Sequence, residues 1–364
     1  MEQTEPNAGL SATGRGERPM HDEAGRLAPF IRRSQVVRLV IGLSALCLVT
    51  IGLASVAQDA PGALEVLSDA SAPWLMGAIA AEAVCYLFIG MLLHGLLGPG
   101  LGRFVSVRAG LLIYGLGSVL PGSPAPGMAL AGGELRRRGI AGSRLGLALF
   151  WCTWFNVRAF LVLAAWTAAS AAVRGRTPEG TGLGVVVGVC LVAGVLALGT
   201  ALVQSPAAAE RLGRLAARLR WRGSRDAIRQ LSGQLHVEAM TMVGGRRRQM
   251  LFGAAALGSW VGDAVCLRLA LIALGIHVSM GIVLIAYVVT NLVALIPILP
   301  GGLGVVELTV AGVLNHYGVS IDRAVAGTLA WRAVSLFLPA LAGLVMYGSF
   351  HWPRRRQREA RAPA

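Results

Sequence analysis

The residues best placed to do chemistry lie in one apolar stretch, which glycines and prolines interrupt just before a glutamate. The stretch reads Asn291-Leu-Val-Ala-Leu-Ile-Pro-Ile-Leu-Pro300-Gly301-Gly302-Leu-Gly304-Val-Val-Glu307. Proline stops a helix and glycine allows a tight turn, so the pattern predicts two short helices with Glu307 in the first turn of the second. A carboxylate there interacts favourably with exposed backbone N–H groups, so a structural helix cap is one interpretation of Glu307. A functional acid is the other.

Other ionisable residues also stand inside long apolar segments. An unpaired acid at membrane depth is costly, so Glu307 needs a partner, and Arg332 in the next apolar segment is the best candidate. An ion pair of this kind that breaks and reforms can gate transport. By the same principle we expect Glu82 and Asp263 to face the protein interior or a polar cavity rather than lipid.

Composition identifies the chain as a membrane protein. Of its 364 residues, 55% are hydrophobic and 14% charged, and the mean hydropathy is +0.64, which is rare in a water-soluble domain. All 33 basic residues are arginine, against 18 acidic residues, for a net charge of +15. The absence of lysine excludes P-loop, Schiff-base and general-base lysine chemistry. Because most arginines flank apolar segments, anionic lipid headgroups rather than nucleic acid are the expected partner.

Neither the cysteines nor the histidines have the spacing of a metal, redox or catalytic site. The cysteines all lie in apolar runs, as Cys47, Cys85, Cys152, Cys190 and Cys266. Buried small hydrophobic side chains are the favoured interpretation. The sequence contains no His-Glu-x-x-His motif and no recognisable Ser-His-Asp arrangement. We therefore expect no catalytic residue, no metal and no cofactor.

Apolar runs of about 20 residues, the length that spans a bilayer, predict the membrane helices. Six full-length candidates occupy residues 36–56, 74–97, 143–172, 181–203, 251–275 and 321–350. Two further apolar regions, 109–133 and 280–317, are interrupted by proline and glycine. The topology depends on whether these two regions cross the membrane.

The first interrupted region is predicted to enter the membrane and return on the same side. A single crossing would place the basic stretch 134–138 opposite Arg103 and Arg108, against the positive-inside rule. The apolar piece before Pro121-Gly122 has about twelve residues, or roughly 18 Å of helix, which is too short to cross. The second region must then be a re-entrant hairpin of opposite sense. Residues 74–172 and 251–350 thus form inverted repeats, which are typical of transporters.

These predictions define an all-α polytopic membrane protein with about six transmembrane helices and two re-entrant helical hairpins. Residues 1–35 are expected to be a disordered cytoplasmic tail, 36–350 the membrane domain and 351–364 a basic cytoplasmic tail. Within the membrane domain, 206–248 forms a basic amphipathic cytoplasmic linker. The linker either binds anionic lipid or is a solvated helix, and both interpretations stay open.

The Pro-Gly-Gly-Leu-Gly-Val-Val-Glu segment, followed by an arginine in the next helix, resembles the lysylphosphatidylglycerol synthase transmembrane-region family, or flippase-like domains. The resemblance implies paired re-entrant helices in two inverted halves and movement of a charged or glycosylated lipid between leaflets. It maps the family's turn onto Pro300, Gly301, Gly302 and Gly304, its acid onto Glu307 and its arginine onto Arg332. The family's earlier turn is similar to Leu120-Pro121-Gly122, with Glu134 to Arg138 as the polar stretch after it.

The chain departs from the family pattern at two places. Many members carry a charged residue directly after the first turn, whereas this chain has Ser123-Pro-Ala-Pro-Gly127. Bifunctional members carry a cytosolic aminoacyl-transferase domain, whereas this chain ends about fourteen residues after position 350. We therefore expect that aminoacyl-lipid synthesis is not encoded here.

The preferred hypothesis is a lipid translocase that moves an anionic, aminoacylated or glycosylated lipid between the leaflets of the cytoplasmic membrane, with both termini cytoplasmic. The alternatives are a non-transporting partner of a cell-envelope or glycolipid enzyme, and a membrane-embedded enzyme acting on a lipid-linked substrate. The enzyme would need ligands or bases that converge at one bilayer depth. The expected lipid-path or gating residues are Glu307, Arg332, Pro300, Gly301, Gly302, Gly304, Asn291, Pro121, Gly122, Glu134, Arg136, Glu82 and Asp263.

The topology predicts which positions can be reached from each side of the membrane. Single cysteines at Ser123 and His316, after replacement of the native five, should react with membrane-impermeant reagents from opposite sides or only from within a cavity. Labelling of Arg137→Cys from outside would contradict the first re-entrant hairpin.

Overall fold

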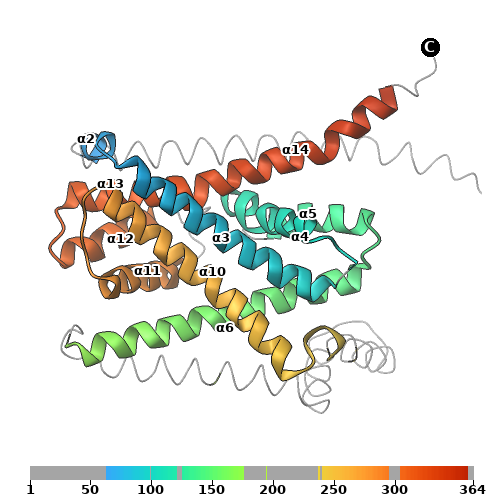
Figure 1. Ribbon diagram of the computed structural model, residues 1–364, viewed down its shortest axis with the longest axis horizontal. Coiled ribbons are helices and arrows are strands. Elements are labelled where there is room, and N and C mark those ends of the chain that lie inside the picture. The colour runs from blue at the N-terminus through green and yellow to red at the C-terminus, as the bar shows by residue number, and fades with distance from the viewer. Residues whose placement is uncertain are drawn as a thin grey trace, which may run out of the picture. The chain divides into compact units, whose positions relative to one another are not determined.

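The computed structural model describes residues 63–98, 100–120, 125–175, 240–294 and 304–359, together with positions 194 and 237 (Figure 1). The chain divides into two units at position 44, and all of these residues belong to the second unit. They form helices joined by turns, with no strand in these ranges. The predicted tail 1–35, the candidate spans 36–56 and 181–203 and most of the linker 206–248 lie outside the described residues.

Four helices in the described ranges are long and apolar enough to cross a membrane. They are α3 (Ala72–Leu97), α6 (Gly142–Val173), α10 (Arg246–Ala273) and the continuous run Ile321–Gly348. That run consists of α13 (Ile321–Arg332), a π-helical segment (Ala333–Phe337) and the first half of α14 (Leu338–Glu359). Four of the six predicted spans are therefore present, and α14 continues to Glu359, nine residues beyond the predicted end of its span at position 350.

Helices α3 and α10 pack against each other in antiparallel orientation. The N-terminal end of α3 meets the C-terminal end of α10, where the Ser71 amide donates a hydrogen bond to the Ala273 carbonyl (2.8 Å). In Figure 1, α3 (blue) and α10 (orange) run along each other. A Cβ added to Gly262 would lie 3.3 Å from the Ala81 carbonyl oxygen. This close approach needs a small residue, as helix packing in membranes commonly does.

The first interrupted region folds as a helical hairpin. Its first arm consists of α4 (Arg103–Gly110), a π-helical segment (Leu111–Gly115) and a 3₁₀ turn (Leu116–Val119). Its second arm is α5 (Ala125–Arg137). The arms meet at glycines, because a Cβ added to Gly117 would lie 3.1 Å from the Gly127 Cα. The α14 helix packs against the same place, where a Cβ on Gly115 would lie 2.5 Å from the Pro339 carbonyl oxygen.

The second interrupted region folds as another hairpin, formed by α11 (Met280–Ala294) and α12 (Val305–His316), which pack side by side (Figure 1). At 1.5 Å per residue, helices of 15 and 12 residues extend roughly 22 and 18 Å, less than the roughly 30 Å of a bilayer core. Gly304 precedes α12 at φ +80°, a conformation that glycine adopts without the penalty other residues incur.

The two hairpins leave opposite ends of the α3–α10 pair. The first lies between the C-terminal end of α3 and the start of α6, which are adjacent because a Cβ on Gly98 would contact the Arg144 side chain. The second lies between the C-terminal end of α10 and the start of α13, where Gly275 approaches Arg323. Since α3 and α10 are antiparallel, these ends are opposite. The same order therefore occurs twice along the chain: a long helix, a hairpin of two short arms, and a second long helix. The placement of each hairpin relative to a bilayer stays a prediction.

Two apolar clusters hold these helices together. One is formed by α10, α11, α12 and α13 around Leu267, Leu271 and Tyr287, and the short helix α2 (Ala63–Ser68) packs against α13. The other is formed by α3, the first hairpin, α6 and the N-terminal half of α10 around Leu92 and Ile113. The charged residues described next lie where α3, α10 and α13 meet.

The α3–α10 contact predicts an asymmetry between two glycines of α10. Gly262→Leu should destabilise the protein by about 1–3 kcal/mol, because the new side chain collides with the α3 backbone. Gly253→Leu is the matched control, since nothing lies within 4 Å of a Cβ at that position. Thermal unfolding in detergent measures both, and equal effects would show that the close approach contributes nothing.

Candidate functional site

The buried ion pair between Glu307 and Arg332 is the centre of the site. Arg332 Nε donates a hydrogen bond to Glu307 Oε1 at 2.8 Å. Both side chains are buried, with 9% and 4% of the arginine and glutamate surfaces exposed. The pairing expected from the sequence is therefore present. Its role in a lipid path stays a prediction.

Local structure positions both partners. Gly304 is the N-cap residue of α12, and Glu307 lies in the first turn of this helix, near the positive end of the helix dipole. Arg332 is the last residue of α13, immediately before the π-helical segment Ala333–Phe337, and such segments frequently occur at functional sites. Glu307 Oε2 is buried and accepts no hydrogen bond from the described residues. It remains available to a ligand hydroxyl, amine or water.

Asp263 connects this pair to the interior of α10. Its Oδ2 accepts a hydrogen bond from the Tyr287 hydroxyl (2.8 Å), and its Oδ1 accepts one from Trp331 Nε1 (2.9 Å). Tyr287 and Trp331 are buried, and their rings meet edge to face at a centroid distance of 6.1 Å. Because Trp331 precedes Arg332 directly, one helical turn carries the donor to Asp263 and the donor to Glu307.

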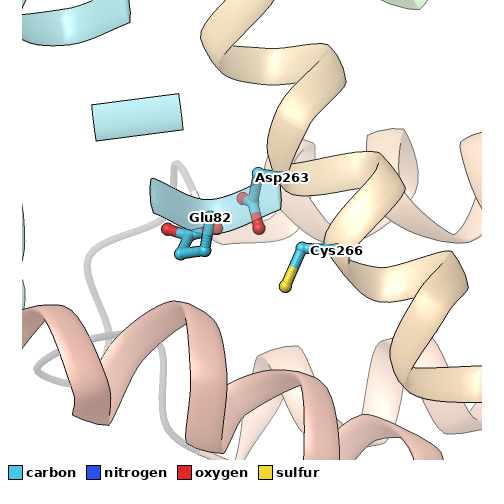
Figure 2. Close-up of side chains that lie close together, drawn as sticks. All are labelled: Glu82, Asp263 and Cys266. Atoms are coloured by element: carbon cyan, nitrogen blue, oxygen red, sulfur yellow. The ribbon is translucent and has the colours of Figure 1, made fainter. Parts of the chain in front are cut away.

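Glu82 completes the cluster from α3. One carboxylate oxygen each of Glu82 and Asp263 and the Cys266 sulfur lie within 4.8 Å of one another (Figure 2). Glu82 is 4% exposed, and its Oε2 has no hydrogen-bond partner in the described part of the chain. Glu82 and Asp263 stand near the middle of their helices, and Arg332 near the middle of the run Ile321–Gly348. The charged groups thus share one level of the helix bundle.

Sequence reasoning selected Glu82 and Asp263 separately and missed their meeting, as well as the roles of Cys266, Tyr287 and Trp331. One signal was available, because Cys266 lies three residues after Asp263 and such residues share a helix face. The expectation of no metal site rested on spacing along the chain. The folded chain nevertheless brings three metal-binding side chains together.

Other predicted site residues lie elsewhere or make local contacts. Asn291 donates to the Tyr287 carbonyl within its own helix (2.9 Å). Glu134 pairs with Arg138 (3.1 Å) and Arg137 (3.8 Å) at the C-terminal end of α5, where Arg136 is exposed. Pro121, Gly122, Pro300, Gly301 and Gly302 lie outside the described residues.

A hollow of about 730 Å³ lies between α6 and the N-terminal part of α10. Apolar side chains such as Phe155, Val162 and Met250 line it together with Arg158 and Arg246. The mixture of aliphatic and guanidinium groups suits an amphipathic molecule with an acidic end.

Long apolar helices, paired hairpins and a charged cluster at mid-helix define a polytopic α-helical membrane protein. The chain belongs to the family described as the lysylphosphatidylglycerol synthase TM region, whose model matches residues 35–343. The resemblance noted from the Pro-Gly-Gly turn, Glu307 and Arg332 is thereby confirmed.

Two curated proteins are also similar to the chain. Both are called UPF0104 membrane protein and come from Methanothermobacter thermautotrophicus. They are 33% and 31% identical over 90 residues, which is 25% of this chain and 26% or 27% of theirs. The matched part therefore spans about a quarter of the length of these relatives.

The buried ion pair predicts a large cost for removing one partner. Glu307→Gln should destabilise the protein by about 3–5 kcal/mol, because it leaves the guanidinium without its buried carboxylate. Glu134→Gln should cost less than about 1 kcal/mol, since the arginines that it pairs with are largely exposed. Thermal unfolding of Glu307→Gln, Glu134→Gln, Arg332→Gln and the double variant Glu307→Gln/Arg332→Gln tests this. If the double variant loses as much stability as Glu307→Gln and Arg332→Gln together, Glu307 and Arg332 are not coupled.

Proposed function

We propose that the protein is a lipid translocase of the cytoplasmic membrane, which moves a lipid with an anionic, aminoacylated or glycosylated headgroup between leaflets. The observation that carries the proposal is the buried Glu307–Arg332 ion pair. Glu307 lies at the start of the short helix α12, and Arg332 lies near the middle of the long helical run Ile321–Gly348. Ionisable groups in membrane helices are expensive, and they commonly mark a substrate path. A passive anchor needs no such pair.

The two hairpins support the proposal through their length and position. Arms α11 and α12 are too short to cross a bilayer alone, and the two hairpins leave opposite ends of the α3–α10 pair. We propose that both are re-entrant and that their tips approach the bilayer midplane from opposite faces. Broken helices at that depth expose backbone groups that must line a cavity or be covered by protein.

Arginine positions support an orientation with the C-terminal end of α3 in the cytoplasm. Basic residues gather at that end of the bundle, as Arg103, Arg108, Arg136, Arg137, Arg138, Arg144, Arg246, Arg247 and Arg248. The opposite end carries Glu65, Asp69 and Asp322 with two arginines, Arg174 and Arg323. The positive-inside rule favours the basic end as cytoplasmic, where it attracts anionic lipid headgroups.

The mechanism that we propose is competition for the Arg332 guanidinium. A lipid phosphate presents two oxygens to a guanidinium in the same forked geometry as a carboxylate, so a headgroup can replace Glu307. Replacement releases Glu307 and with it the first turn of α12, while the acyl chains stay in lipid. Glu82, Asp263 and Asn291 belong to the same proposed path. The chemical class of the cargo is thus an anionic phospholipid or glycolipid.

Liposomes with a fluorescent anionic phospholipid in one leaflet test the proposal. The unaltered protein should redistribute the lipid, and Glu307→Gln and Arg332→Gln should each slow this by at least about 10-fold, the equivalent of about 1.4 kcal/mol. Glu307→Asp, which keeps the charge, should retain more activity than Glu307→Gln.

The controls separate loss of transport from loss of the protein. Reconstituted amount and size-exclusion profile should match across variants. Redistribution that is unaffected by both substitutions would contradict the role of the ion pair. No redistribution of any lipid class by the unaltered protein would contradict transport and favour a non-transporting partner of an envelope-biosynthesis enzyme.

A further inference from the structure

The Glu82, Asp263 and Cys266 side chains form a ligand set that the ion-pair mechanism does not require. Their oxygen and sulfur atoms lie within 4.8 Å of one another, and Figure 2 shows the two carboxyl groups side by side with the thiol on the next turn of α10. The set combines two helices, because Glu82 comes from α3 while Asp263 and Cys266 come from α10. The tight packing around Gly262 fixes these two helices relative to each other.

Glu82 is the observation that points to a ligand. A buried carboxyl group normally accepts hydrogen bonds, yet Glu82 Oε2 has no partner among the described residues. Only 4% of the surface of Glu82 is exposed. Its nearest charged neighbour in the set is another acid, Asp263. Two carboxylates at this distance in a medium of low dielectric repel each other, so either a shared proton or a bound cation must reduce the negative charge between them.

Asp263 is held as metal-ligating carboxylates usually are. Tyr287 and Trp331 each donate a hydrogen bond to a different oxygen of Asp263, which fixes the plane of the carboxylate. Each oxygen has a second lone pair, so these bonds leave acceptor capacity toward Glu82 and Cys266. Asp263 is the least buried of the three side chains.

We propose that Glu82, Asp263 and Cys266 bind a divalent transition-metal ion, with Zn²⁺ the best match to the ligands. Zn²⁺ is borderline soft and accepts sulfur together with carboxylate oxygen, whereas Ca²⁺ and Mg²⁺ need about six oxygen ligands. On binding, the Cys266 thiol transfers its proton to solvent as the metal–sulfur bond forms. Three protein ligands leave one tetrahedral position open to water or to a phosphate oxygen.

Cobalt binding provides the test, because a Co²⁺–thiolate bond absorbs in the near ultraviolet. Protein purified without a polyhistidine tag and treated with chelator should take up Co²⁺ stoichiometrically with that absorption, and Zn²⁺ should displace it. Cys266→Ser should abolish the thiolate band, and Glu82→Gln should weaken binding by at least about 10-fold. The matched control is Cys152→Ser, which alters an equally buried cysteine on α6 and should leave the band unchanged.

The outcomes distinguish the metal site from its rivals. A band that survives Cys266→Ser, or binding equal in all variants, would show that Cys266 is not the thiolate ligand and would contradict the proposed site. No uptake by folded protein would mean that the two acids share a proton and bind no metal. Because Cys266→Ser is nearly isosteric, it decides the matter even where Glu82→Gln does not fold. Metal uptake is measured without transport, so this inference and the translocase proposal fail separately.

Discussion

The structure depends on keeping a few charged groups inside helices that are otherwise apolar. A guanidinium or carboxylate removed from water loses hydration worth far more than a typical hydrophobic contact, so each one must be compensated locally. Arg332 is compensated by Glu307 at 2.8 Å, and Asp263 by two donors. Glu82 Oε2 and Glu307 Oε2 are the two carboxylate oxygens of the described residues that are buried without a hydrogen-bond partner. These two acids within apolar helices are therefore the groups on which we base the proposed ligand sites.

These groups also explain why the bundle has its particular arrangement. The cluster takes side chains from α3, α10, α11, α12 and α13, so all five helices must meet at one level for any of them to be satisfied. Apolar surfaces alone specify helix register weakly inside a membrane, where lipid is as good a solvent for leucine as protein is. Here the hydrogen bonds of Asp263 and the ion pair of Arg332 define the register.

Hydropathy and arginine position predicted the long helices, the interrupted regions and their order, because these depend on local length and composition. The Glu307–Arg332 contact was also predictable, since an isolated acid in an apolar stretch must find the nearest available cation. The meeting of Glu82 with Asp263 and Cys266 could not be predicted from the sequence. It depends on how α3 and α10 cross at Gly262, a tertiary contact that no spacing along the chain encodes. Glu134 and Arg136 lie on α5, away from the charged cluster, and this placement also depends on tertiary packing that spacing along the chain does not encode.

The contact between the first hairpin and α14 links the two halves of the molecule mechanically. Gly115 lies against the Pro339 carbonyl and Gly343 against the Leu111 carbonyl, so the two backbones touch with no side chain between them. Contacts of this kind cannot be compressed, and a shift of α14 must push the first hairpin along with it. Arg332 lies seven residues before Pro339 in the same continuous helix. A rearrangement at Arg332 that moves this helix would therefore also displace the first hairpin.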